Sequence, residues 1–215
     1  MPGASDGPRG RLATISAALL VGGASSRMGR DKAHVELDGV PAATRLSQLL
    51  GDLFEDVLIV GGDPPASARG RRVADAEGPQ CALRGIASAL AAAEAERVLV
   101  LATDLPLVTP DLLLALVAWP EADAVVPRAA DGRHPLCALY RREPVLRVAN
   151  ERLAAGRLQL RGLLDAVDSA YLEAADLACV DPDGAALTNV NTPEDLERAR
   201  AARASALPLA PTRRH

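Results

Sequence analysis

Residues 17–32 read AALLVGGASSRMGRDK and place a glycine-rich loop directly after an apolar run. The run, residues 15–21, is too short for an ordinary helix and is typical of a buried strand. The glycine pair that follows allows a sharp turn that brings backbone N–H groups against an anion. Arg27 offers a planar fork and Lys32 a compact charge for phosphate oxygens. The stretch therefore predicts a strand followed by a loop that holds a triphosphate.

Two better-known glycine loops do not fit this stretch. A P-loop requires Lys directly after its last glycine, whereas Gly29 is followed by Arg30. The dinucleotide fingerprint GxGxxG does not fit either, because residues 22–24 read GGA. On the residues alone, a plain turn with solvated cations stays open. The full pattern GGxSxRMGxDK resembles the signature of the molybdenum cofactor guanylyltransferases, which are nucleotidyltransferases with a Rossmann-like fold. The resemblance extends over about residues 16–204.

Downstream of the loop, strand-like and helix-like segments alternate. Strands are expected at 15–21, 56–60, 71–74, 97–102 and 123–127, and helices at 42–53, 82–93, 110–118, 143–155, 160–167 and 193–204. This succession predicts an α/β fold with a mostly parallel sheet and helices on both faces, and the resemblance specifies a Rossmann-like three-layer αβα nucleotidyltransferase fold. Ligands of such sheets lie beyond the carboxyl ends of the strands, where the first loop also lies.

The composition is that of one enzyme domain. With 215 residues and 49% apolar content, the chain can form one large core, which we expect at 13–204 between flexible tails at 1–12 and 205–215. The net charge of −4 and the lack of basic stretches interleaved with aromatics argue against nucleic-acid binding. No apolar stretch approaches the length of a membrane span, so no membrane association is expected. Three widely spaced cysteines suit reduced thiols in a cytoplasmic protein.

A carboxylate follows the apolar residues 98–102 in the stretch VLVLATDLPLVTP. After a parallel strand, Asp104 would face the same crevice as the glycine loop, and a hard oxygen ligand there can share Mg²⁺ with phosphate oxygens. A turn aspartate before Pro106 is the alternative. The DxP element resembles the metal-binding aspartate of the guanylyltransferases, so the resemblance implies Asp104 as the principal magnesium ligand.

Residues 188–196, TNVNTPEDL, combine two asparagines with a helix start. Thr192 is a natural N-cap before a proline at the first helical position. On a strand, Asn189 and Asn191 would face the same side and could present amides to substrate or metal-bound water, whereas turn-forming asparagines are the alternative. The ending NxNTPEDL resembles the guanylyltransferases, while related cytidylyltransferases tend to carry aspartates here. The resemblance therefore favours GTP over CTP.

Four further positions match the family more weakly. Asp75, after residues 71–74, aligns with an aspartate that contacts the nucleotide, although an exposed turn acid is the alternative. His134, Arg157 and Arg161 lie where the family handles the pterin substrate. An exposed turn histidine and solvated arginines at helix ends are the alternatives for these three.

The sequence departs from the family at residues 78–85, which read GPQCALRG in place of a compact GPLAG. In relatives this turn lies against the nucleotide, so Cys81 and Arg84 change the surface that holds the base or the ribose. Arg84 would either add a phosphate contact or point into solvent.

The resemblance implies Mg²⁺-dependent transfer of GMP from GTP to the molybdenum–molybdopterin cofactor, which gives the guanine dinucleotide form and pyrophosphate. Arg27 and Lys32 would draw charge from the β- and γ-phosphates. The backbone that shapes the nucleotide pocket would be that of Leu20, Val21, Gly22 and Gly23. Molybdenum-insertion proteins and recipient molybdoenzymes are the protein partners that the resemblance suggests. A molybdopterin cytidylyltransferase, another small-phosphate or sugar-1-phosphate nucleotidyltransferase, and a nucleotide-sensing adaptor without activity remain as alternatives.

Overall fold

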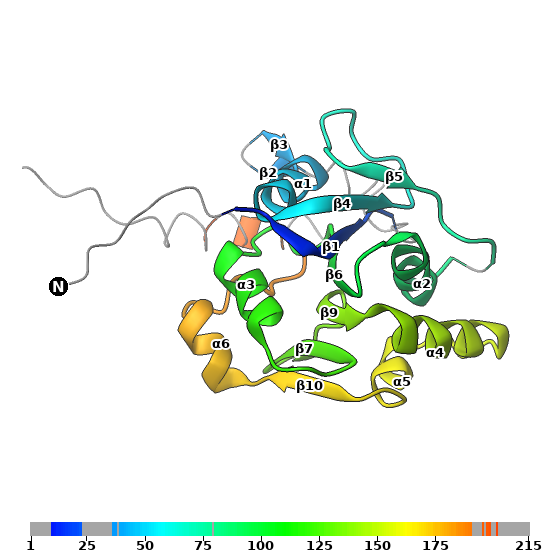
Figure 1. Ribbon diagram of the computed structural model, residues 1–215. Coiled ribbons are helices and arrows are strands. Elements are labelled where there is room, and N and C mark those ends of the chain that lie inside the picture. Colours follow the sequence, from blue (N-terminus) through cyan, green and yellow to red (C-terminus); the bar gives the residue numbers. More distant parts are fainter. Residues whose placement is uncertain are drawn as a thin grey trace, which may run out of the picture.

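The computed structural model describes residues 10–22, 36–37, 39–78, 80–190, 195, 197–198 and 201. An eight-stranded sheet runs through the molecule, with helices on both sides (Figure 1). Its strands are β1 (Leu12–Leu20), β4 (Phe54–Val60), β5 (Arg71–Val73), β6 (Arg97–Ala102), β7 (Ala124–Ala129), β8 (Gly132–Arg133), β9 (Cys137–Arg141) and β10 (Ser169–Leu172). A separate two-stranded ladder joins β2 (Glu36–Leu37) to β3 (Val40–Pro41).

The order of the strands is β10-β7-β9-β6-β1-β4-β5, and β8 pairs with β7 outside this path. β1 lies at the centre, parallel to both β4 and β6, and β5 continues the parallel arrangement beside β4. β9 runs antiparallel to both of its neighbours, β6 and β7. The short β8 also runs antiparallel to its partner, β7. The predicted mostly parallel α/β sheet is therefore confirmed, with two reversed strands, β8 and β9, that the sequence reading did not foresee.

Two hydrophobic layers lie on the two faces of the sheet because residues of alternate parity on a strand point to opposite faces. In β1, Ala17 and Leu19 belong to the layer that includes α1 (Ala42–Leu53), α3 (Pro110–Ala118) and α6 (Ala174–Val180). Ala18 and Leu20 belong to the layer that includes α2 (Ala82–Ala92), α4 (Arg142–Ala154) and α5 (Leu160–Leu164). β1 is therefore buried on both faces, which explains its continuous apolar sequence.

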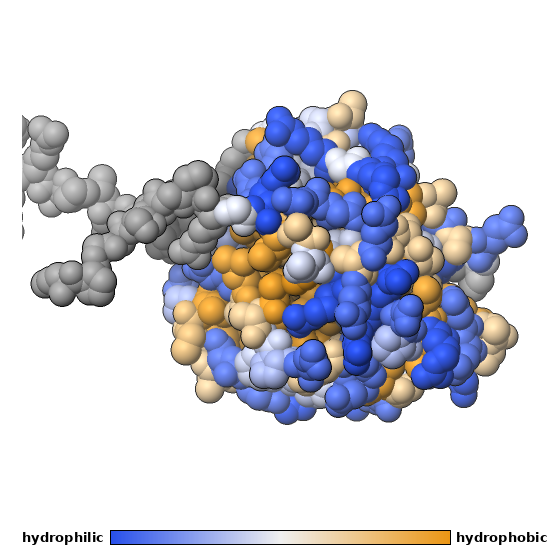
Figure 2. Space-filling model, in the orientation of Figure 1, coloured by the Kyte–Doolittle hydropathy of each residue, from blue (hydrophilic) through white to orange (hydrophobic). Residues whose placement is uncertain are grey.

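Helix α3, with the sequence PDLLLALVA, is apolar around most of its circumference. In the orientation of Figure 1, hydrophobic residues gather around α3 on the viewer's face (Figure 2). Thr109 caps the helix, because its side-chain oxygen accepts a hydrogen bond from the Leu112 N–H. Across the described ranges, every helix is too short or too polar to cross a lipid bilayer.

Several predicted bounds agree with the structure and others do not. α1, α3 and β6 have the predicted bounds, whereas α5 ends at Leu164 rather than at residue 167. The strand β10 and the helix α6 were not predicted. β10 has only four residues, too few for a period to be recognised, although the capping box of Glu173 and Asp176 is a signal for α6 that could have been read. Of the predicted helix at 193–204, the described residues are helical and the others lie outside the described part.

Candidate active site

A pocket of about 200 Å³ opens where β1, β4 and β6 end and α2 begins. Its wall joins segments that are far apart in the sequence but meet at the carboxyl edge of the parallel strands, as expected for an α/β sheet. The lining residues are Leu20, Val21, Gly22, Val60, Asp75, Gln80, Cys81, Ala82, Gly85, Ala102, Thr103, Asp104 and Leu136. The structure thus brings five of the predicted nucleotide-binding residues, Leu20, Val21, Gly22, Asp75 and Asp104, to one pocket.

The end of β1 is held by its two parallel neighbours. The Val21 N–H donates to the Val60 carbonyl over 2.8 Å, and the Leu20 carbonyl accepts from the Thr103 N–H over 3.3 Å. Gly22 follows with a φ of +114°, a conformation that other residues rarely adopt. The turn expected after the first strand therefore begins at Gly22, while Gly23, Arg27 and Lys32 lie outside the described residues.

Asp104 is half-buried on a short turn after β6. Its backbone carbonyl accepts a hydrogen bond from the Val190 N–H over 2.8 Å, which brings the predicted asparagine segment beside it. Burial and then the charge of Asp104 raise the pKa of the Cys137 thiol to about 12, so the carboxylate lies near this buried cysteine. The second and third sequence motifs thus meet at one place in the fold.

Asn189 itself is exposed and does not lie in a strand. The expectation that Asn189 and Asn191 share one face of a strand is therefore wrong for Asn189. Among the described residues, one backbone hydrogen bond, that of Val190, joins this segment to the site, and a ladder needs several. Asn191 lies outside the described part of the chain. The role of both amides in binding the pterin stays a prediction.

Asp75 also lines the pocket and lies just after β5. Its Oδ2 accepts a hydrogen bond from Nη2 of Arg84 over 3.1 Å. Arg84 also donates through Nη1 to the Gly78 carbonyl, and its side chain is only 12% exposed. The alternative in which Arg84 points into solvent is therefore wrong. The sequence reading missed this pair because residues nine positions apart on a strand end and a helix carry no signal of contact.

The sequence reading also missed several lining residues. Gln80 and Ala82 flank Cys81 at the start of α2, and Thr103 precedes Asp104. The signal that could have found the first group is the GPQCALRG departure itself, because that turn was expected to lie against the nucleotide. Thr103 is 5% exposed and places a hydroxyl-bearing residue in the wall beside the carboxylate.

Four of the predicted pterin residues, His134, Arg157, Arg161 and Asn189, lie within the described part of the chain, and none of these four lines the pocket. The His134 ring is buried, and its Nε2 lies 2.9 Å from Oδ1 of Asp131. The exposed-histidine alternative is therefore wrong for His134. Leu136, two residues later, does line the pocket. Arg157 and Arg161 are exposed around the junction of α4 and α5.

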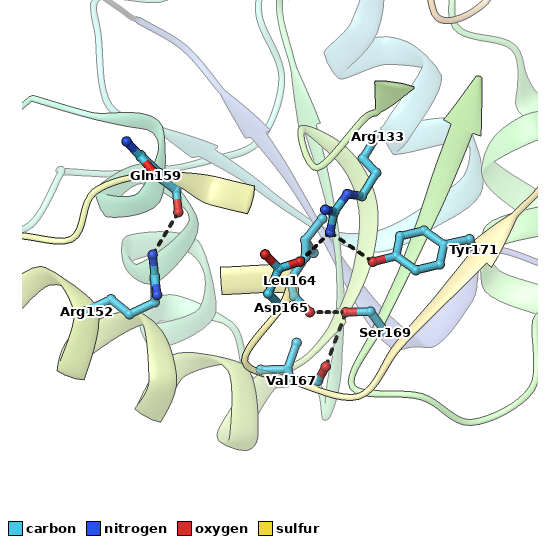
Figure 3. Close-up of polar contacts among 8 residues, drawn as sticks. All are labelled: Arg133, Arg152, Gln159, Leu164, Asp165, Val167, Ser169 and Tyr171. Atoms are coloured by element: carbon cyan, nitrogen blue, oxygen red, sulfur yellow. Dashed lines mark hydrogen bonds and ion pairs between the residues drawn. The ribbon is translucent and has the colours of Figure 1, made fainter. Parts of the chain in front are cut away.

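Close to that junction, polar contacts join β8, α5 and β10 (Figure 3). Nη1 of Arg133 donates to Asp165 over 2.7 Å and to the Tyr171 hydroxyl over 3.2 Å. The hydrogen bond from Arg133 holds the pKa of the Asp165 carboxyl below its ordinary value. Arg152 donates to the carbonyl of Gln159 over 3.2 Å. These contacts fix the arrangement of β8, α5 and β10 near the predicted pterin residues Arg157 and Arg161.

The described ranges contain no group of three or more His, Cys, Asp or Glu residues that could hold a metal ion. Asp104 nevertheless fits Mg²⁺, because this ion is commonly bound by one or two carboxylates together with phosphate oxygens of a substrate and water. The half-buried carboxylate lines a pocket large enough to admit part of a nucleotide.

Comparisons with known proteins agree with this geometry. Residues 17–182 match the model of the MobA-like NTP transferase domain. A protein of Chloroflexus aggregans named probable molybdenum cofactor guanylyltransferase is 34% identical over 199 residues, which cover 87% of this chain and 94% of that protein. The molybdenum cofactor guanylyltransferase of Desulfosudis oleivorans is 30% identical over 193 residues, covering 87% and 95% of the two chains.

Solved structures show the same fold at lower identity. Molybdopterin-guanine dinucleotide biosynthesis protein A from Archaeoglobus fulgidus superposes with a TM-score of 0.75 at 24% identity, over 88% of this chain and 99% of that one. The 2-C-methyl-D-erythritol 4-phosphate cytidylyltransferase of Thermus thermophilus superposes with a TM-score of 0.63 at 18% identity, over 87% and 98% of the chains. The expected nucleotidyltransferase fold is thereby confirmed.

Proposed function

The chain belongs to the MobA-like NTP transferase family, and from this premise we propose that it transfers GMP from GTP to the terminal phosphate of the molybdenum–molybdopterin cofactor. The observation that carries the proposal is the single pocket that gathers Leu20, Val21, Gly22, Asp75 and Asp104 at the carboxyl edge of the sheet. The guanylyl choice is supported by the names of the relatives that match most of the chain.

The reaction forms one bond and breaks one. An oxygen of the terminal phosphate of the pterin attacks the α-phosphorus of GTP, and the bond from that phosphorus to the oxygen bridging the α- and β-phosphates breaks. Pyrophosphate leaves with the electron pair. Because the attacking phosphate is already anionic, no strong general base is needed. Catalysis then rests on positioning and on neutralising charge.

Different residues would position the nucleotide, neutralise phosphate charge and bind the pterin. The backbone of Leu20, Val21 and Gly22, which lines the pocket, would contact the nucleotide, and Asp104 in the same pocket would hold Mg²⁺. When bound, the ion offsets negative charge on phosphate oxygens. Arg27 and Lys32 would act on the β- and γ-phosphates from the loop that follows Gly22. His134, Arg157, Arg161, Asn189 and Asn191 are proposed to meet the pterin, with partner proteins delivering it and receiving the product.

The test is a transfer assay with purified protein, molybdopterin, Mg²⁺ and each of GTP and CTP in turn. With GTP we expect release of pyrophosphate and formation of the guanine dinucleotide product. The kcat/KM for GTP should be at least ten times that for CTP, and a tenfold ratio corresponds to a free-energy difference of about 1.4 kcal/mol. Equal use of both nucleotides, or a preference for CTP, would replace the guanylyltransferase with a cytidylyltransferase. Binding of GTP without any turnover in the presence of the pterin would indicate a nucleotide-sensing protein.

A further inference from the structure

We infer that Arg84 is a positioning residue that holds the Asp75 carboxylate toward the base of the bound nucleotide and so sets base selectivity. The inference rests on the proposed function, because it concerns the same pocket. It starts from the place where the sequence departs from the family pattern, GPQCALRG at residues 78–85. Arg84 comes from the first turn of α2, whose Ala82 and Gly85 line the pocket.

Asp75 stands between two hollows of the surface. One is the pocket described above, and the other is a pocket of about 400 Å³ formed by the turn after β4 and by β5. A carboxylate in the wall between two pockets can point into either of them. Arg84 donates to Oδ2 from the α2 side, and a Cβ at Gly61 would lie only 2.8 Å from the same oxygen. Oδ2 is thus fixed between α2 and Gly61.

The other carboxylate oxygen is left for a ligand. Within the described part of the chain, Oδ1 of Asp75 accepts no hydrogen bond from protein. Oδ1 is therefore the acceptor that Asp75 can offer to a nucleotide. An ionised carboxylate accepts hydrogen bonds and donates none, so it selects ligand groups that bear N–H or O–H.

Arg84 is suited to hold this arrangement. Its planar guanidinium joins the Asp75 carboxylate to the Gly78 carbonyl, so one rigid group ties the end of β5 to the turn before α2. Within the described residues its buried Nε has no hydrogen-bond partner, so its hydrogen bonds to these two acceptors come from Nη1 and Nη2. Arg84 also balances the negative charge of Asp75 at a pocket that must admit a polyanion.

The position of Asp75 along the sheet points to the base rather than the phosphates. Asp104 follows β6 and Asp75 follows β5, with β1 and β4 between these strands. At about 4.8 Å per strand spacing, three spacings separate the ends of β6 and β5 by roughly 14 Å, a span that suits a nucleotide from α-phosphate to base. Guanine presents adjacent N1–H and 2-amino donors on its pairing edge, whereas hypoxanthine lacks the 2-amino group.

The test measures the dissociation constants of GTP and inosine triphosphate by calorimetry with Mg²⁺, in the absence of pterin. For Arg84→Ala we expect GTP selectivity over inosine triphosphate to fall about tenfold, the loss that corresponds to 1.4 kcal/mol. Arg84→Gln, which keeps donors but loses the charge, serves the same comparison if Arg84→Ala does not fold. Loss of affinity for both nucleotides by the same factor would overturn the inference, since it would indicate a phosphate contact.

Arg71→Ala is a matched control on β5, the strand that Asp75 follows. Arg71 also joins a carboxylate and a carbonyl, lying 3.9 Å from Asp56 and donating to the Ala92 carbonyl over 2.9 Å. Neither Arg71 nor Asp56 lines the nucleotide pocket. We expect Arg71→Ala to leave the selectivity unchanged. A drop equal to that of Arg84→Ala would mean that any loss of an ion pair on β5 disturbs the pocket, and would overturn the inference.

Asp75→Asn completes the design. If Arg84 acts through Asp75, the double variant Asp75→Asn/Arg84→Ala should have the same selectivity for GTP over inosine triphosphate as Asp75→Asn alone. A further drop in the double variant, as large as the drop caused by Arg84→Ala alone, would overturn the inference. Wild-type selectivity between GTP and CTP tests the proposed function separately. Should the wild type prefer CTP, the proposed function fails, and the double-variant comparison with the preferred nucleotide still decides whether Arg84 works through Asp75.

Discussion

At Asp104, the competing roles of metal ligand and turn residue predict opposite results for Asp104→Asn. The amide keeps nearly the same shape but removes the charge that a hard cation requires. For a metal ligand, we expect loss of nearly all Mg²⁺-dependent GTP consumption and an apo melting temperature that barely falls or even rises, because a carboxylate kept for function is not a stabilising choice. The measurements are apo melting curves and a Mg²⁺ titration of turnover.

Asp111→Asn is the control for this substitution. Asp111 is exposed in the first turn of α3 and lies outside the nucleotide pocket. Its replacement should leave turnover unchanged and lower stability only by the few tenths of a kcal/mol to about 1 kcal/mol expected for a charge at a helix N-terminus. An Asp104→Asn protein that melts much earlier yet keeps normal Mg²⁺-dependent turnover would remove Asp104 from the active site.

Among elements, the turn after β1 begins with a glycine in a backbone conformation that other residues rarely adopt. Gly22 has a φ of +114°, and a Cβ added there would lie 3.4 Å from the backbone of Gly62. Gly132, the first residue of β8, has a similar φ of +126° with open space around it. We expect Gly22→Ala and Gly132→Ala each to lower the free energy of unfolding by about 1 to 3 kcal/mol through backbone strain, measured by urea unfolding.

The two glycines differ in what the turn serves. Only Gly22 lines the nucleotide pocket, so Gly22→Ala should in addition weaken GTP binding by about tenfold or more, whereas Gly132→Ala should leave it unchanged. Calorimetric titration of both variants with GTP decides this. Equal affinities in the two variants would show that the β1 turn is a structural feature with no part in nucleotide binding.

Elements with a strong local signal could be predicted from the sequence. α3 begins at Pro110 after a capping Thr109, and β6 is an uninterrupted apolar run, so their bounds were found correctly. The reversed direction of β9 could not be read, because its pairing with β6 and β7 depends on contacts distant in sequence. The Asp75–Arg84 pair was hidden for the same reason, whereas Asp75 and Asp104 each follow a strand and could be assigned to its carboxyl end.

On the scale of the whole molecule, the nucleotide pocket joins segments that the fold alone holds together. Its wall takes residues from the ends of β1, β4 and β6 and from the start of α2, together with Asp75, two residues after the short β5. The four strands are neighbours in the sheet, in the order β6-β1-β4-β5. A ligand that contacts all of them binds only when the sheet is assembled, so its binding energy adds to the stability of the fold.

This linkage gives a prediction about the entire domain. With Mg²⁺ and GTP at a hundred times its dissociation constant, the free energy of unfolding should rise by about 2.7 kcal/mol. For a chain of this size, that corresponds to a rise in melting temperature of roughly 5 to 10 °C. CTP at the same concentration should give a clearly smaller rise, and Asp104→Asn should lose the part of the stabilisation by GTP that depends on Mg²⁺.

Scanning calorimetry of both proteins with each nucleotide, with and without Mg²⁺, makes the comparison. If GTP raises the melting temperature equally without Mg²⁺, or equally in Asp104→Asn, then nucleotide binding does not depend on a metal ion held by the carboxylate of Asp104.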